Sequence, residues 1–536
     1  MSLENLIEKI IDLSMQEIDE LVEKGITLND TDIEKILSYE DEKLKEILFK
    51  NEKLKQFILK EINSYGIKLF ATIAQNPNKK IPEKYEQIYK NYLKQYFKEG
   101  LALEIMDEKG KQLFDLIVRA KKNPFVMQEY NSNKVWSQYR KVITEAIEKD
   151  VSALSPKEIE QYDKTLKYHF GKIILGYDMP EAEFMLKIAQ KKDVDISSIT
   201  ALDIFTKQYE KEKNNSNSKM IKKDEVFSVI LDYAILLKQK EIEKEGQYSP
   251  IKEMEQSIRE GKFGENNSLS KEEFAFVLKV LKNPEIFEVE LNEKIKVILI
   301  NQNLQIDMGV RECQELLLNT EITDKLLEEF PHLKNEVLKQ FNSFAIQMFQ
   351  NISNSKEKCS EDTKKIVEQY LKQYFKEGLT LEILSENGRL LFDTISKARW
   401  SNEFVKEEYQ KNKIWSLYSN IITMLIEKDP STLSDKEVEQ YNETLKQYFG
   451  RIIIGYNLTE VDYLLKIAGR DDINISKLTA LDAFVKRYEK QKNESNKEMI
   501  RDDEVFSATL DYDILLKQKG IEKEGQYSPI KEMEQS

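Results

Sequence analysis

The stretch SPKEIEQYDKTLKYHF, residues 155–170, shows most clearly how this chain folds. Four apolar side chains recur along it at intervals of three or four residues: Ile159, Tyr162, Leu166 and Phe170. Because an α-helix turns once in about 3.6 residues, this spacing places them on one helix face. Ser155 and Glu158 form a capping box ahead of the stripe, with Pro156 at the first helical position. The stretch therefore predicts an amphipathic helix with one buried face.

The same period covers most of the 536 residues, and we expect an all-α fold. No segment shows sustained strand alternation bounded by hairpin turns. Glycine and proline, at 17 and 10 residues, are scarcer than in turn-rich β proteins. Further capping boxes are expected at Ser270 with Glu273 and at Ser434 with Glu437. Besides the helix in the quoted stretch, we expect helices at about 3–22, 31–73, 83–99, 101–121, 132–149, 181–191, 197–212 and 223–245.

The sequence also repeats itself once over a long period. Three segments return nearly unchanged: residues 63–65 as 342–344, 92–100 as 370–378, and 246–250 as 525–529. The offsets are 279, 278 and 279, so one residue is lost early in the second copy and one is gained later, near Trp400. This period is far longer than the roughly 20–50 residues of a solenoid repeat. We predict a tandem duplication of a whole module.

The repeat sets the expected domain organisation. We predict two homologous multi-helix modules, 1–257 and 269–536, joined by a Gly/Asn/Ser-containing linker at 258–268. Each module has an expected seam, near 75–83 and near 351–362, between a short and a longer helical piece. Helix pairs could stack within a module as in helical-repeat proteins, although no short period demonstrates this.

Composition excludes several functional classes. The 82 basic and 96 acidic residues give a formal charge of −14, which repels phosphate backbones, so we expect no nucleic-acid partner. The longest apolar runs are far shorter than the roughly 20 residues of a membrane span. Only Cys313 and Cys359 occur and the start lacks a signal-peptide pattern, so we expect a cytoplasmic protein. Export without a cleaved signal would leave no trace by these criteria.

No motif with a recognised chemistry is present. There is no glycine-rich phosphate loop, paired-histidine zinc motif, nucleophile elbow or Cys-x-x-Cys pair. The only two histidines, His169 and His332, align with a tyrosine and a lysine in the other copy. We therefore predict no catalytic residues and no cofactor, which favours a protein that is not an enzyme.

Two sets of carboxylates remain as candidate metal ligands. Asp224 and Asp232 lie eight residues apart with Ser228 between them, and Asp503 and Asp511 occupy the corresponding positions. On a helix this spacing puts the oxygens along one face, and Mg²⁺ accepts such ligands. The favoured alternative is an acidic helix start, which the helix dipole stabilises without any metal.

Aromatic residues give the candidate recognition surface. The pairs Trp136 with Tyr139 and Trp415 with Tyr418 are each three residues apart on one helix face. Together with Tyr96 and Tyr374 they could line a groove between helices: Tyr96, Trp136, Tyr139, Tyr374, Trp415 and Tyr418. Trp and Tyr are enriched in binding hot spots, although an aromatic stripe at helical spacing is more often part of a core.

These observations lead to three functional hypotheses. The first is a non-catalytic protein-binding or scaffold protein, a bivalent adaptor in which two modules hold partner sites at once. The second is a structural or assembly subunit whose modules pack against neighbouring chains. The third is a metal-dependent hydrolase that uses the carboxylates named above.

Overall fold

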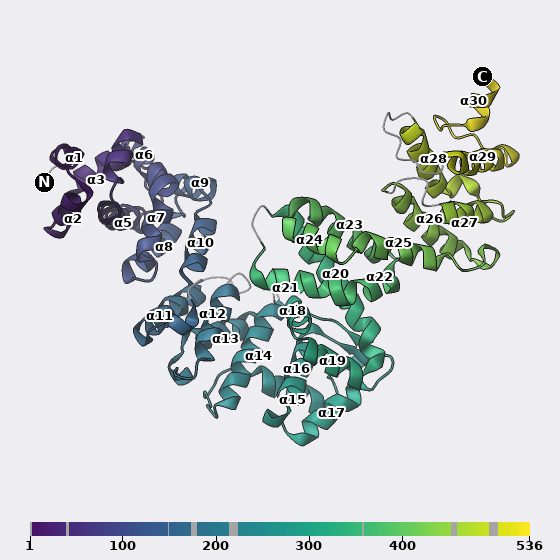
Figure 1. Ribbon diagram of the computed structural model, residues 1–536. Coiled ribbons are helices and arrows are strands. Elements are labelled where there is room, and N and C mark those ends of the chain that lie inside the picture. The colour runs from purple at the N-terminus through teal and green to yellow at the C-terminus, as the bar shows by residue number, and fades with distance from the viewer. Residues whose placement is uncertain are drawn as a thin grey trace. The chain divides into compact units, whose positions relative to one another are not determined.

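A computed structural model describes residues 3–38, 42–147, 150–172, 179–213, 223–355, 359–451, 458–492 and 502–535 (Figure 1). Within these ranges almost all regular structure is helical, which confirms the predicted all-α fold. The strands found there are two residues long: β1 (Ser268–Leu269) pairs in parallel with β2 (Gln305–Ile306). None of the helices in the described ranges combines the length and the apolar character that crossing a bilayer requires.

Contacts divide the chain into two compact units, Met1–Gln256 and Ser257–Ser536. The first unit runs through α1 (Leu3–Ile11), α2 (Met15–Glu23), α3 (Asp30–Ser38), α4 (Glu42–Leu48), α5 (Glu52–Gln75), α6 (Glu83–Asn91), η1 (Tyr92–Tyr96), α7 (Phe97–Glu104), α8 (Glu108–Ala120), α9 (Pro124–Ser132), α10 (Val135–Ile147), η2 (Val151–Ala153), α11 (Pro156–Lys172), α12 (Met179–Ala189), η3 (Ile196–Ser198), α13 (Ala201–Lys213), α14 (Lys223–Gln239) and α15 (Pro250–Arg259), whose last turn belongs to the second unit.

The second unit then contains, besides the two strands, η4 (Glu265–Asn267), α16 (Lys271–Lys282), η5 (Pro284–Ile286), α17 (Val289–Leu299), α18 (Val310–Leu318), α19 (Thr320–Glu329), η6 (Pro331–Leu333), α20 (Lys334–Asn354), α21 (Glu361–Gln369), η7 (Tyr370–Tyr374), α22 (Phe375–Glu382), α23 (Glu386–Ser401), α24 (Glu403–Lys411), α25 (Ile414–Leu425), η8 (Pro430–Thr432), α26 (Asp435–Phe449), α27 (Leu458–Ala468), η9 (Ile475–Lys477), α28 (Thr479–Lys492), α29 (Asp502–Gln518) and α30 (Pro529–Gln535).

Within each unit, helices that are not adjacent in sequence pack against each other. In the first unit α5 packs on α7 and α8, α11 on α13, and α12 on α14. In the second, α20 packs on α22 and α23, α26 on α28, and α27 on α29. Because α5 and α20 end at the predicted seams, the helices before and after each seam share one packed core.

The quoted stretch folds as its pattern predicts. Its four apolar side chains are buried on α11, and the backbone N–H of Ser155 donates to Glu158 Oε2 at 2.9 Å. The capping boxes at Ser270 and Ser434 are also formed, which confirms both predictions. Local side-chain hydrogen bonds thus fix where these helices start, while the apolar stripe fixes which face is buried.

Three predicted helices are wrong in their continuity: those over 3–22 and 31–73, and the one over 101–121, which is interrupted at 105–107 between α7 and α8. The helix expected over 31–73 is three helices, and the last begins where Asn51 Oδ1 accepts from the N–H of Leu54 at 2.9 Å. The helix expected over 3–22 breaks at Ser14, which forms a capping box with Glu17. Ser and Asn side chains that bind nearby backbone N–H groups start new helices, and this local preference outweighs the continuing apolar period.

The stretch predicted as a linker, 258–268, lies within the second unit and packs against α16. Phe263 is buried and its ring lies 6.2 Å from that of Phe276 on α16. The N–H of Gly264 donates to Glu273 Oε1 at 3.1 Å.

A buried polar network surrounds the repeated YLKQY segments, which form the π-helical turns η1 and η7. In the first unit Asn63 Nδ2 donates to the carbonyl of Gly100 at 2.8 Å and to Glu104 Oε2 at 2.7 Å. Tyr92 Oη donates to Asn63 Oδ1 at 3.2 Å. The second unit repeats the arrangement around Asn342, with distances of 2.9, 2.6 and 2.8 Å.

Candidate functional site

The four tyrosines of the predicted groove lie in the helical core. Tyr96, Tyr139, Tyr374 and Tyr418 are only 2%, 4%, 8% and 2% exposed. Tyr139 stacks on Phe114 with ring centroids 3.5 Å apart. These tyrosines therefore present almost no surface to a partner, and they serve to support their neighbours.

The two predicted tryptophans lie at the half-buried edge of this core. Trp136 is at the start of α10 and Trp415 at the start of α25, each with its ring centroid 6.0 Å from that of the following tyrosine. Lys134 and Lys413 precede these helices in the left-handed backbone region, with φ of 49° and 48°. This turn is uncommon for a residue with a side chain, and it directs both chains into the tryptophan-bearing helices.

Trp415 lines a cavity of about 350 Å³ that we call the tryptophan pocket. It is formed by the end of α23, by α24 and by the start of α25, and its lining includes Arg399, Trp400, Lys406, Tyr409, Lys413 and Trp415. The side chain of Trp400 is 77% exposed, the most exposed aromatic side chain among the large hydrophobic residues of the described ranges. No lining residue carries a carboxylate.

Arg399 occupies the pocket between aromatic rings. Its guanidinium lies 4.8 Å from the Trp400 ring and 4.5 Å from the Tyr409 ring, distances at which cation–π attraction operates. Arg399 Nε is buried and has no hydrogen-bond partner among the described residues, whereas the buried Tyr409 Oη lies close to the hydroxyl of Ser396. Burial raises the pKa of Tyr409, so this phenol stays protonated and can donate.

The charges of the pocket are only partly neutralised. Lys406 pairs with Glu403 at 2.9 Å. Neither Arg399 nor Lys413 forms an ion pair with any acidic residue in the described part of the chain. The pocket thus combines two exposed or half-buried indoles with two cations that have no counter-ion among the described residues.

The first unit holds a related but simpler arrangement at the corresponding positions. Lys121 takes the place of Arg399, and its ammonium lies 4.8 Å above the ring of Tyr130. Burial raises the pKa of Tyr130 to about 12. Lys122 stands where the second copy has Trp400, so the first unit lacks the second indole. The sequence analysis did not single out Arg399 or Tyr409. The one sequence feature near them is the extra residue of the second copy, close to Trp400.

The predicted metal ligands are not part of any cluster of three metal-ligating side chains among the described residues. Asp224 and Asp232 lie on α14, and Asp503 and Asp511 on α29, but the hydroxyl of Ser228 donates to the backbone carbonyl of Asp224 at 3.2 Å. Throughout the described ranges, no three His, Cys, Asp or Glu side chains form a group that could hold a metal ion. The geometry therefore gives no support to the metal site.

Two buried carboxylates at corresponding positions have different surroundings. Glu181 on α12 pairs with Arg140 at 2.8 Å. Glu460 on α27 accepts from Thr423 Oγ1 at 3.0 Å, and Ser419 replaces the arginine. Burial raises the pKa of Glu460, because removing a carboxylate from water penalises its charged form.

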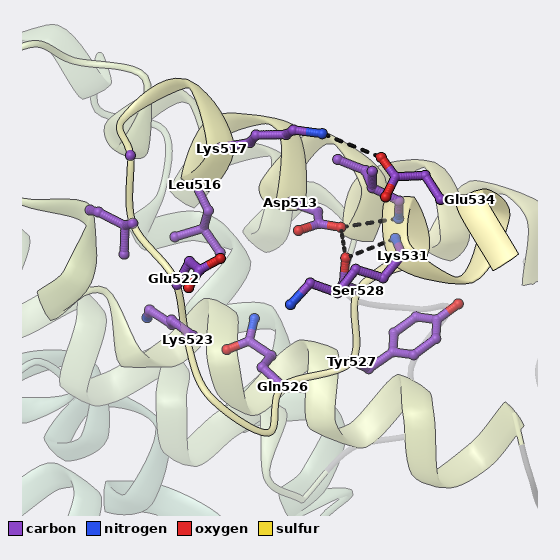
Figure 2. Close-up of a pocket in the computed structure, with 13 residues that line it drawn as sticks. Asp513, Leu516, Lys517, Glu522, Lys523, Gln526, Tyr527, Ser528, Lys531 and Glu534 are labelled. Atoms are coloured by element: carbon purple, nitrogen blue, oxygen red, sulfur yellow. Dashed lines mark hydrogen bonds and ion pairs between the residues drawn. The ribbon is translucent and has the colours of Figure 1, made fainter.

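A second cavity, of about 400 Å³, lies between α29, the loop that follows it and α30 (Figure 2). Asp513 accepts from Ser528 Oγ at 2.5 Å and from the N–H of Ile530 at 3.1 Å, and Lys517 pairs with Glu534 at 3.5 Å. Lys523 pairs with Asp482 at 2.5 Å. Most of the charged groups around this cavity pair with other groups of the protein. We therefore interpret the cavity as part of the packing between α29 and α30, not as a ligand site.

Comparison with known proteins does not add a functional assignment. The chain matches no known protein-family profile and no curated protein.

Proposed function

We propose that this protein is a non-catalytic, protein-binding adaptor whose recognition site is the tryptophan pocket of the second unit. The observation that carries the proposal is the 77% exposure of Trp400 beside Arg399 and Trp415. Trp and Arg are among the residue types most enriched in binding hot spots, and Trp400, Trp415 and Arg399 line this pocket at exposed or half-buried positions. Burying this exposed indole against a partner would contribute favourable apolar area.

The first unit supports a second, weaker site of the same kind. Trp136, Tyr130 and Lys121 keep the half-buried indole and the cation over a tyrosine. Two such sites on one chain can bind two copies of a motif in one partner, and linking them raises avidity by about 10²–10⁴-fold. The acidic composition and the two cysteines favour a cytoplasmic setting for this function.

The test is variant-dependent binding of an identified partner. Partners retained by the tagged full-length chain are identified by native mass spectrometry, then purified and titrated by calorimetry against Trp400→Ala, Trp415→Ala and Met424→Ala. Met424 lies on the same helix as Trp415 and is 64% exposed, so its variant is the matched control. We expect both tryptophan variants to weaken binding at least about tenfold, because hot-spot truncations cost about 2 kcal/mol or more. Equal affinity for all three variants would refute the proposal.

A further inference from the structure

We infer that the tryptophan pocket recognises a peptide segment that carries a single carboxylate next to an apolar side chain, with Arg399 as the residue that binds the carboxylate. The inference rests on the proposed protein-binding function and names the chemistry of the partner.

The positive charge of the pocket favours an anionic ligand. Arg399 and Lys413 line it without a described counter-ion, and the lining contains no acidic residue. Arg399 Nε is buried and makes no hydrogen bond to the described protein. A carboxylate bound to the guanidinium of Arg399 would neutralise part of the positive charge and accept charge-assisted hydrogen bonds.

The position of Arg399 suits a carboxylate in particular. The rings of Trp400 and Tyr409 lie 4.8 and 4.5 Å from the guanidinium and hold it in place. A guanidinium that is already fixed loses little freedom on binding, and its planar set of N–H donors matches the two oxygens of a carboxylate.

The remaining surface of the pocket selects a peptide over a small free anion. Trp400 and Trp415 supply apolar area that an inorganic anion cannot cover. The formal charge of −14 opposes ligands with many negative charges, but one carboxylate embedded in an apolar segment avoids most of this repulsion. The first unit, with Lys122 in place of the indole, would bind the same segment more weakly.

The test follows the three tryptophans of the full-length chain by fluorine NMR after 5-fluorotryptophan labelling. The probes are the peptides acetyl-Phe-Glu-Phe-amide and acetyl-Phe-Gln-Phe-amide, and inorganic phosphate. We expect the glutamate peptide to shift the Trp400 and Trp415 signals with an affinity at least about tenfold above that of the glutamine peptide, as expected for a charge-assisted hydrogen bond. Equal affinity of the two peptides, or equal shifts with phosphate alone, would overturn the inference.

Variants assign the effect to the proposed residue. Arg399→Gln should remove the preference for the glutamate peptide, and Arg399→Lys should keep part of it, because Lys121 fills this position in the first unit. Lys531→Gln, in the cavity of Figure 2, is the charge-matched control and should change nothing. A preference that survives Arg399→Gln would also overturn the inference. If Trp400→Ala weakens partner binding but the two peptides bind equally, the inference fails while the proposed function stands. If neither tryptophan variant changes partner binding, the proposed function itself fails.

Discussion

Replacing Asn63 by leucine tests whether the buried polar network holds the first unit together. Asn63 is fully buried, and its side chain bridges the carbonyl of Gly100, the carboxylate of Glu104 and the hydroxyl of Tyr92. Leucine fills a similar volume but makes no hydrogen bond, so three buried polar groups lose their partner.

The expected loss follows from these three bonds. Each of the two neutral bonds contributes about 1 kcal/mol, and the bond to the carboxylate of Glu104 contributes about 2 kcal/mol. We therefore expect Asn63→Leu to lower the free energy of unfolding of the first unit by about 4 kcal/mol. Tyr92→Phe removes one neutral bond and should cost only about 1 kcal/mol.

The measurement uses urea titration with 5-fluorotryptophan signals as separate reporters. Trp136 reports on the first unit, and Trp415 on the second. The midpoint reported by Trp136 should fall in the Asn63→Leu protein, whereas that reported by Trp415 should stay unchanged.

A double-mutant cycle with Gly100 gives the decisive result. A Cβ atom at Gly100 would lie 2.5 Å from Asn63 Oδ1, so Gly100→Ala should destabilise the native background. In an Asn63→Ala background the space is free, and the same change should stabilise by up to about 1 kcal/mol through helix propensity. If Gly100→Ala has the same effect in both backgrounds, the network reasoning is refuted.

Three further outcomes can be checked on the same protein. Burial raises the pKa of Glu460, so its stabilising contribution is complete below the ordinary value of 4.5 and is lost as pH rises through the raised pKa. Glu460→Gln should therefore increase the thermal midpoint at pH 8, whereas Glu181→Gln, which breaks a buried ion pair, should lower the free energy of unfolding by about 3 kcal/mol. Identical changes in the stability of the two variants at pH 8 would contradict this. Asp513→Ala removes the acceptor of Ser528 and Ile530, so hydrogen exchange at the start of α30 should accelerate while α15 stays unchanged. Cys313 is fully buried and burial raises its pKa, so an aromatic disulfide reagent should titrate one thiol, Cys359, in the native protein and two in urea.

Local patterns in the sequence were sufficient for the fold class and for most helix starts. The stripe of α11 and the capping boxes at Ser155, Ser270 and Ser434 are determined by residues within one or two helical turns. The apolar period alone predicted continuous helices at 3–22 and 31–73, whereas the N-caps Ser14 and Asn51 start new helices within these stretches.

The candidate site could be predicted only in part. The sequence pointed to Trp136 and Trp415 but could not separate an exposed indole from the buried tyrosines three residues away, since both lie on one helix face. Arg399 and Tyr409 belong to different helices, and their contact depends on how α23 packs against α24.

By itself, the sequence determined that the chain is helical, that three short segments recur along it, and that it lacks a recognised catalytic motif, because periodicity, caps and motif spacing are local properties of the chain. Only the tertiary structure decided which aromatic residues are core and which are surface, and which charges lack a partner. Burial and ion pairing are set by neighbours far apart in sequence, as for Arg140 with Glu181. For that reason the tryptophan pocket, with Arg399 between Trp400 and Tyr409, could be found only after the helices had been placed against one another.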